Sequence, residues 1–212
     1  MDYNFIVIEG NIGAGKTTLA RKISEDYNAK LIPEDFAENP FLPKFYKNPE
    51  KYSFPLELSF LADRYQQLKN EVRDRELFKS FIVSDYYFTK SLIFAVNTLS
   101  DDEFQLYRRI FDIIYSSLPK PDLYVYLYLD VNNLKKNINR RGRLYEKDIK
   151  PEYLDNIQKG YFEYMRIHSS EFKFLVIDTN NIDFVRNQSD YKRVRDQIFN
   201  KKYEIGINRV IL

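Results

Sequence analysis

The sequence lacks cysteine entirely and contains a single histidine, His168, among its 212 residues. Without cysteine the chain can form no disulfide, no thiol nucleophile and no zinc site with cysteine ligands. One histidine excludes a histidine-dependent catalytic triad and a metal site built from several histidines. Any chemistry must therefore rest on carboxylates, lysine, arginine, hydroxyl groups and the backbone.

The sequence also lacks an excess of charge of one sign and any long apolar run. Lysine and arginine number 33 against 31 aspartate and glutamate, a net charge of +2, so no strongly basic surface for DNA or RNA is expected. No apolar run approaches the roughly 18–20 residues of a membrane helix, and the first residues carry no basic secretory region. With 44% hydrophobic residues, we expect one globular domain over residues 1–212, cytoplasmic and without a membrane partner.

Short apolar runs alternate with longer stretches of helical periodicity. This alternation predicts an α/β fold with a parallel sheet covered by helices on both faces. One long helical stripe has apolar residues at positions 58, 61, 65, 68 and 72, which predicts a buried helix or a dimer interface over Leu56 to Val72. Five strands are expected, at residues 3–8, 29–33, 81–83, 123–129 and 174–177.

Each predicted strand runs into an acidic residue. Ligands of open α/β sheets bind beyond the carboxyl ends of the strands, so these acids are candidates for a site. An aspartate at this place is also common as a turn former or helix N-cap, and that alternative is stronger for Asp130 and Asp178. The acids are Glu9, Glu34, Asp85, Asp130 and Asp178.

Residues Gly10 to Thr17 match the pattern G-x-x-x-x-G-K-[ST], between a predicted strand and a predicted helix over Lys16 to Tyr27. In this pattern the loop backbone and the helix N-terminus bind phosphate oxygens. Lys16 neutralises the β and γ phosphates, and the Thr17 hydroxyl can ligate Mg²⁺. The predicted ATP-binding residues are Gly10, Asn11, Ile12, Gly13, Ala14, Gly15, Lys16, Thr17 and Thr18.

The loop alone does not identify the phosphoryl acceptor, because GTPases, ATPases and small-molecule kinases share it. No N-K-x-D motif for guanine recognition occurs in the sequence. The run ending in Asp130 also resembles the magnesium-binding strand of an ATPase, which leaves an ATPase or nucleotide switch as an alternative.

Several motifs occur in a fixed order along the chain. They are residues 8–19, Pro33-Glu34, residues 45–49, Ile93-Phe94-Ala95, Arg141-Gly142-Arg143 with Glu146, and residues 151–154. Together they resemble the deoxynucleoside kinase family, in particular bacterial deoxyadenosine and deoxyguanosine kinases, over about residues 3–180. The resemblance implies a P-loop kinase fold with an arginine-rich lid at about 139–150. It also implies a homodimer, magnesium-dependent transfer of the γ-phosphoryl group of ATP to the 5′-hydroxyl of a deoxynucleoside, and a role in nucleotide salvage.

The resemblance assigns catalytic roles to Lys16, Glu34 and the lid. Glu34 resembles the family glutamate that accepts the 5′-hydroxyl proton, although Asp35 stands beside it where the family has proline. Arg141 and Arg143 resemble the lid arginines that stabilise charge on the transferring phosphoryl group. Without the resemblance, the same arginines together with Arg140 would be read equally well as a solvated helix end.

Two further residues match the family's contacts to the sugar. Glu146 in the lid and Tyr46 resemble groups that bind the 3′-hydroxyl. An earlier lid arginine of some members corresponds here to Asn137.

Glu57 and Arg64 lie seven residues apart and therefore on one face of the long predicted helix, offset from its apolar stripe. An exposed ion pair is the usual explanation of such charges. In the family a glutamine matches Glu57 and contacts the base, and an arginine matches Arg64 in purine- and cytosine-using members. Because a carboxylate only accepts hydrogen bonds, glutamate favours bases that offer donors, and we expect a preference for purines.

The strand end Ser84-Asp85-Tyr86 departs from the family's Glu-Arg-Ser or Asp-Arg-Ser, since the arginine is missing. Counting back without gaps from Ile93-Phe94-Ala95 aligns Ser84, and not Asp85, with the acidic residue of the family motif. We nevertheless expect Asp85 in the substrate site and near Mg²⁺, because hard cations recruit carboxylates.

Two more alternatives stay open. The fold could serve as a noncatalytic nucleotide-binding subunit, or the acceptor could be a nucleoside monophosphate, which would need an extra cation such as Arg64. After the last predicted strand, residues 180–184 could line the adenine pocket, although a plain loop is the simpler interpretation.

Overall fold

A computed structural model describes residues 3–34, 39–73, 78–143, 146 and 149–212. The chain divides into two compact units. Unit 1 comprises residues 1–33, 76–86 and 120–212, and unit 2 comprises residues 34–75 and 87–119. The expectation of one domain over residues 1–212 stays a prediction.

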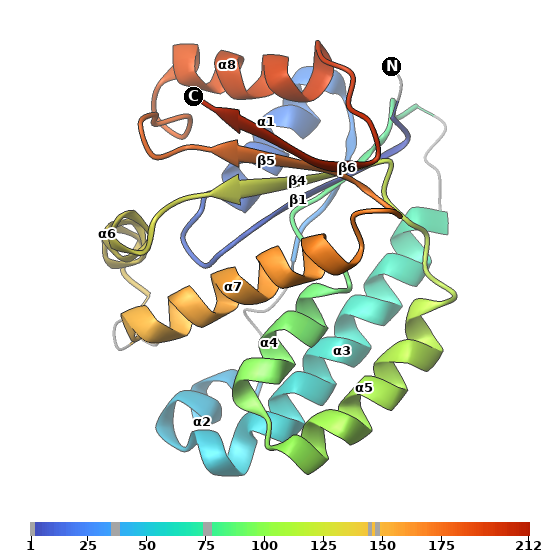
Figure 1. Cartoon of the computed structure of the whole chain (residues 1–212), viewed down its shortest axis with the longest axis vertical. Coiled ribbons are helices and arrows are strands. Elements are labelled where there is room, and N and C mark those ends of the chain that lie inside the picture. The colour runs from blue at the N-terminus through green and yellow to red at the C-terminus, as the bar shows by residue number, and fades with distance from the viewer. Residues whose placement is uncertain (1–2, 35–38, 74–77, 144–145, 147–148) are drawn as a thin grey trace. The chain divides into compact units, whose positions relative to one another are not determined.

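Unit 1 is built on a parallel sheet, as the alternation of strands and helices predicts. The strands are β1 (Phe5–Gly10), β2 (Lys30–Ile32), β3 (Ile82–Ser84), β4 (Leu123–Tyr128), β5 (Lys173–Asp178) and β6 (Gly206–Ile211). Their order in the sheet is β2-β3-β1-β4-β5-β6, and all neighbours are parallel (Figure 1).

The prediction of five strands was wrong, because the sheet has six. Strand β6 pairs with β5 from Gly206 to Ile211. It lies at the edge of the sheet and its residues are half-buried or exposed. Its sequence therefore lacks the continuous apolar run that marks the buried strands.

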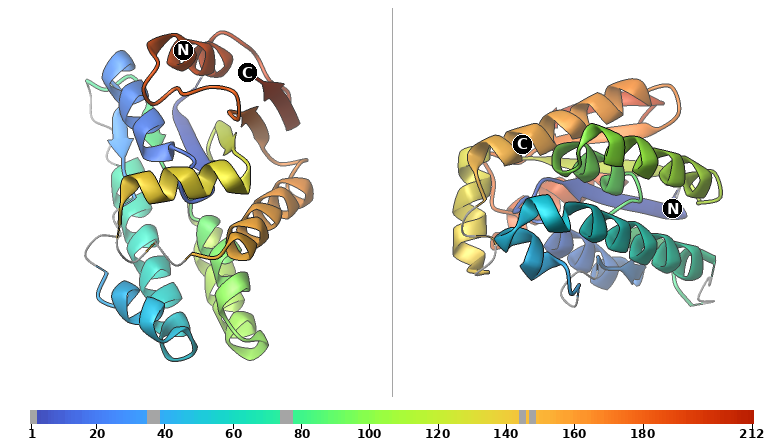
Figure 2. Two further views of the ribbon diagram at one scale, coloured as in Figure 1. Left: turned by 90° about the vertical axis from the view of Figure 1, so that its left-hand side faces the viewer. Right: turned by 90° about the horizontal axis from the view of Figure 1, so that it is seen from below.

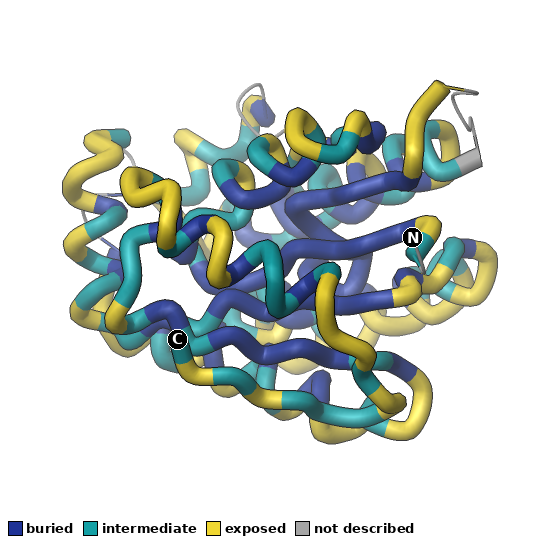
Figure 3. Tube along the Cα trace, turned by 90° about the horizontal axis from the view of Figure 1, so that it is seen from above, coloured by how far each residue is buried: buried dark blue, intermediate teal, exposed yellow. Residues whose placement is uncertain are grey.

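Figure 3 shows the buried strands of unit 1 between helices that are exposed on their outer sides. The register brings Val7 of β1 opposite Ser84 of β3. The loop that follows β1 and the residue that follows β3 therefore leave the same edge of the sheet from adjacent strands.

Helices cover both faces of the sheet, as predicted (Figures 1 and 2). On one face, α1 (Lys16–Tyr27) and α8 (Gln188–Phe199) pack together through the rings of Tyr27 and Phe199, with centroids 4.3 Å apart. On the other face, Tyr161 of α7 (Pro151–Ile167) packs on Tyr126 of β4 at 5.0 Å. Helix α6 (Val131–Arg141) follows β4.

Unit 2 is helical. It consists of α2 (Leu42–Lys47), α3 (Pro49–Arg73), α4 (Lys90–Thr98) and α5 (Asp101–Tyr115). Aromatic packing fixes its core, in which Phe88 stacks on Phe111 with ring centroids 4.8 Å apart. Ser100 and Glu103 form a capping box at the start of α5.

Helix α3 differs from its prediction in where it begins and in which face it buries. It begins at Pro49 and contains Pro55 in its interior. Its buried face carries Leu61 and Leu68 together with Glu57 and Arg64, so the two charged residues are not on an exposed face. Packing inside unit 2 thus buries a carboxyl group and a guanidinium group, those of Glu57 and Arg64.

None of the helices in the described ranges combines the length and the apolar character that crossing a membrane requires.

Candidate active site

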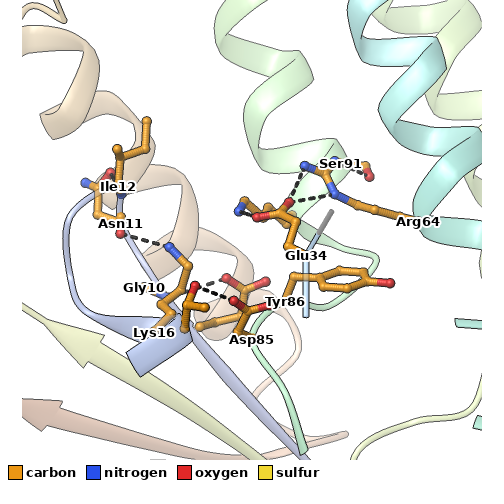
Figure 4. Close-up of polar contacts among 12 residues, drawn as sticks. Gly10, Asn11, Ile12, Lys16, Glu34, Arg64, Asp85, Tyr86 and Ser91 are labelled. Carbon is orange, nitrogen blue, oxygen red and sulfur yellow. Dashed lines mark hydrogen bonds and ion pairs between the residues drawn. The ribbon is translucent and has the colours of Figure 1, made fainter. Parts of the chain in front are cut away.

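The loop between β1 and α1 has the geometry that its glycines predict. Gly15 has φ +90° and caps the N-terminus of α1, whose first residue is Lys16. A Cβ on Gly10 would lie 2.8 Å from the backbone oxygen of Leu127, so only glycine fits beside β4. The Lys16 ammonium donates to the backbone oxygen of Asn11 at 3.0 Å (Figure 4). The backbone of the loop and the ammonium of Lys16 therefore form one potential phosphate site.

Asp85 and Thr17 meet beside this loop. The Thr17 hydroxyl donates to Oδ2 of Asp85, whose side chain is buried. The hydroxyl of Ser84 instead donates to the backbone oxygens of Ile32 and Tyr86, at 3.1 and 2.7 Å. The carboxylate that faces the loop therefore comes from Asp85, although ungapped alignment favours Ser84.

A hydroxyl and a carboxylate in contact suit Mg²⁺, which prefers hard oxygen ligands. The described residues contain no cluster of three or more acidic or histidine side chains that could hold a metal alone. Mg²⁺ typically binds one or two protein carboxylates and takes its other oxygens from substrate phosphates and water. Thr17 and Asp85 fit that pattern.

A cavity of about 280 Å³ opens over the loop. Its lining includes Lys16 and Thr17 at the start of α1, Arg140 and Arg141 from the last turn of α6, and Arg143 just after that helix. The cations predicted to bind phosphate thus line the same cavity. An anionic ligand such as a triphosphate matches its charge.

The two predicted lid arginines also hold Glu146. Arg141 Nε and Nη2 lie 3.0 and 2.5 Å from Oε2 of Glu146, and Arg143 Nη1 lies 3.3 Å from Oε1. Glu146 is buried, whereas both arginine side chains are about one third exposed. The structure therefore brings these three predicted residues together as one ion-paired group.

A second cavity, of about 220 Å³, shares Gly15, Asn137 and Arg140 with the first. Its other lining residues include Asn180 and Phe184. Four residues of the segment 180–184 thus line a cavity next to the phosphate site, and their contact with adenine stays a prediction.

Two of the strand-end acids serve as structural caps. Oδ1 of Asp130 accepts from the backbone N–H of Asn133 at 2.8 Å and caps α6. Oδ1 of Asp178 accepts from the backbone N–H of Asn180 at 3.0 Å. The turn and cap interpretation is confirmed for both, and Asp130 is engaged away from Thr17.

Unit 2 gathers a second charged group around Glu34 (Figure 4). Arg64 Nε and Nη2 donate to Oε1 of Glu34 at 3.1 and 2.8 Å, and Arg64 Nη1 donates to the Ser91 hydroxyl at 2.8 Å. Lys90 Nζ forms an ion pair with Oε2 of Glu34. Burial opposes the charge of Arg64, but Glu34 outweighs it and raises the pKa of Arg64. Glu34 is thus a carboxylate with 9% of its side-chain surface exposed, held between two cations.

Glu57 lies near Arg64 on α3 and is almost completely buried. Its Oε1 accepts from the Thr98 hydroxyl at 2.9 Å. Its Oε2 has no hydrogen-bond partner within the described part of the chain. Burial raises the pKa of Glu57 to about 7, against the opposing effects of Arg64, Thr98 and Lys90. Glu57 is thus a buried acid with a raised pKa, and one of its oxygens has no partner among the described residues.

Tyr46 and Asp35 are the remaining predicted residues of this part of the chain. Tyr46 lies half-buried on α2, where its ring packs against Phe45 at 5.3 Å. Asp35, the alternative to Glu34, lies outside the described residues.

Lys90 and Ser91 belong to the charged group around Glu34, and sequence reasoning missed both. Lys90 is the first residue of α4, where the helix dipole disfavours a cation. A lysine at that position, three residues before the buried Ile93, was the available signal. Lysines are seldom buried without a partner, and a partner distant in sequence leaves no local pattern.

Comparison with known proteins agrees with this chemistry. The sequence profile of the family described as deoxynucleoside kinase matches residues 6–203. Deoxyguanosine kinase of Bacillus subtilis is 38% identical over 90% of this chain and 93% of its own length. Deoxyadenosine kinase of Dictyostelium discoideum is 33% identical over 76% of this chain and 66% of its own length. A solved deoxyadenosine kinase of M. mycoides superposes with a TM-score of 0.79 at 25% identity, over 93% of this chain and 100% of that one.

Proposed function

Since this chain belongs to the deoxynucleoside kinase family, we propose that it transfers the γ-phosphoryl group of ATP to the 5′-hydroxyl of a deoxypurine nucleoside. The observation that carries the proposal is the Glu34 carboxylate, whose side chain is 9% exposed and is held by Arg64 and Lys90. Relatives named deoxyguanosine and deoxyadenosine kinases support the purine preference.

On the donor side, the loop after β1 and Lys16 bind the β and γ phosphates of ATP. The adenine would occupy the second cavity, beside Asn180 and Phe184. Thr17 and Asp85 would hold Mg²⁺, which neutralises charge on the phosphates when bound. Arg141 and Arg143 stabilise the charge that develops on the transferring group.

On the acceptor side, Glu34 orients the 5′-hydroxyl and takes its proton. The O–H bond breaks, the 5′-oxygen forms a bond to the γ-phosphorus, and the bond from that phosphorus to the β–γ bridging oxygen breaks to release ADP. The transition state is loose and proton transfer comes late. A carboxylate that holds the hydroxyl in line is therefore sufficient.

Glu57 and Arg64 recognise the nucleobase of the acceptor. The unpartnered oxygen of Glu57 accepts from N1–H and N2–H of guanine or from the amino group of adenine, and Arg64 supplies donors. Protonated Glu57 gains a donor, so base preference depends on pH. Tyr46 and Glu146 bind the 3′-hydroxyl, and Glu146 leaves its arginines when phosphates attract them.

We further propose a homodimer. Val96, Leu106 and Ile113 are large apolar residues exposed on α4 and α5, and a second copy would cover them. The cytoplasmic location and the role in nucleotide salvage stay predictions.

The test is a screen of the four deoxynucleosides, their ribose counterparts and their monophosphates with ATP and Mg²⁺. The proposal expects 5′-phosphorylation of deoxyguanosine or deoxyadenosine above the others. Phosphorylation of monophosphates instead would make the chain a nucleoside monophosphate kinase. Phosphate release unaffected by any nucleoside would indicate an ATPase. Nucleotide binding without transfer would indicate a noncatalytic subunit.

A further inference from the structure

Lys90 is a buried cation at the start of α4. Its side chain is 8% exposed, and its ammonium pairs with Oε2 of Glu34 while lying 5.4 Å from the ring centre of Phe94. Removing an ammonium from water costs several kcal/mol unless an anion compensates it. Lys90 therefore depends on the negative charge of Glu34.

The two cations on Glu34 are held differently. Arg64 is fixed at both ends of its guanidinium, since Nε and Nη2 contact Glu34 and Nη1 contacts Ser91. Lys90 reaches the other carboxylate oxygen by a flexible stem with a rotatable ammonium. Of the two, Lys90 is better able to follow a change in the position of negative charge.

The proposed reaction moves negative charge at this place. Before transfer, Glu34 carries one negative charge between the two positive charges of Arg64 and Lys90. When Glu34 takes the 5′-hydroxyl proton it becomes neutral, while the 5′-oxygen becomes part of a phosphate monoester with a charge of about −1.5 to −2. A buried ammonium left beside a neutral acid would be strongly disfavoured.

We propose that Lys90 is a catalytic cation that passes from the Glu34 carboxylate to the 5′-phosphoryl group as the proton arrives on Glu34. This rests on the proposed function, in which Glu34 is the proton acceptor. Lys90 keeps its own proton throughout, and no further reactant is needed. The ammonium stabilises Glu34 as an anion in the ground state and the phosphate in the product.

The charges that face Glu34 set the expected pH behaviour. Arg64 and Glu57 lie on α3, Lys90 on α4 and Tyr107 on α5. Glu57 interacts electrostatically with the other three groups, and Arg64 also interacts with Tyr107. Loss of the Lys90 charge removes one of the cations that contact Glu34, which favours protonation of Glu34. The acid limb of the kcat profile should then move to higher pH.

The experiment compares Lys90→Met, Lys90→Arg and the control Lys69→Met, which removes an exposed lysine of α3. Dissociation constants are measured for deoxyguanosine and for its 5′-monophosphate, together with kcat as a function of pH. Lys90→Met should lower kcat by about 100-fold and shift the acid limb of the kcat profile to higher pH. It should also weaken binding of the monophosphate at least about tenfold more than binding of the nucleoside. Lys90→Arg should restore most of each loss, and Lys69→Met should resemble the wild type.

If Lys90→Met weakens binding of the nucleoside and of the monophosphate equally and leaves the acid limb of the kcat profile in place, Lys90 is a structural residue and the proposal is wrong. Circular dichroism checks folding, and if Lys90→Met does not fold, Lys90→Gln is judged by the same criteria. Glu34→Gln separates this failure from that of the proposed function. If Glu34→Gln is inactive and Lys90→Met is fully active, the proposed role of Lys90 is wrong and Glu34 remains the proton acceptor. If Glu34→Gln remains active, Glu34 is not the proton acceptor, and the proposed role of Lys90 is wrong as well.

Discussion

Glu57→Gln should stabilise the protein, by an amount that grows with pH. Burial raises the pKa of Glu57 to about 7 in the folded protein, from an ordinary value of 4.5. Below pH 4.5 the carboxyl is protonated in both states and contributes nothing. Between these values the folded state binds more protons than the unfolded state, so wild-type stability falls as pH rises, and above about 7 the loss is complete.

The magnitude follows from the two pKa values. At about 1.4 kcal/mol per unit of pKa, the change from 4.5 to about 7 corresponds to about 3 to 4 kcal/mol for a residue with 3% of its surface exposed. Glutamine has the same shape and no charge to bury. Any fixed cost of the new amide group is independent of pH, so it does not alter the slope.

The assay is urea unfolding of both proteins at about pH 5 and about pH 8. The free energy of unfolding of Glu57→Gln, minus that of the wild type, should be about 2 to 3 kcal/mol larger at the higher pH. Glu25→Gln, at an exposed position on α1, should show a nearly constant difference. A constant difference for Glu57→Gln as well would mean that Glu57 does not carry a buried charge at pH 8.

Four further results are expected. Lys16→Ala and Arg143→Ala should each lower kcat/KM by orders of magnitude while circular dichroism stays unchanged, because each removes a cation from the phosphoryl site; full activity of Arg143→Ala would remove the lid from the mechanism. Glu34→Gln should lose kcat while calorimetry still detects nucleoside binding, since the proton acceptor is needed only during transfer. Glu57→Gln should shift the ranking of kcat/KM among the four deoxynucleosides toward thymidine, and the wild type should shift the same way at about pH 6, where Glu57 is protonated; an unaltered ranking would place Glu57 outside the base site. Ile113→Glu should lower the mass measured by light scattering from dimer to monomer, and an unchanged mass would argue against an interface on α5.

The sequence by itself determined the elements whose signals are local. The phosphate loop is defined by residues that are consecutive in the chain, so Gly10 to Thr17 could be assigned with the helix that begins at Lys16. Buried strands such as β4 were recognisable because both faces of a central parallel strand are apolar. Asp130 and Asp178 were correctly expected to cap or turn the chain, since a cap depends only on the next few residues.

Tertiary structure decided what depends on distant partners. Helical spacing placed Glu57 and Arg64 on one face of α3, but only packing against the other helices of unit 2 decided that this face is buried, and burial is what raises the pKa of Glu57. Strand β6 forms because β5 offers it an edge. Lys90 meets Glu34 from 56 residues away, and a buried charge is stable only where the fold brings its counter-ion.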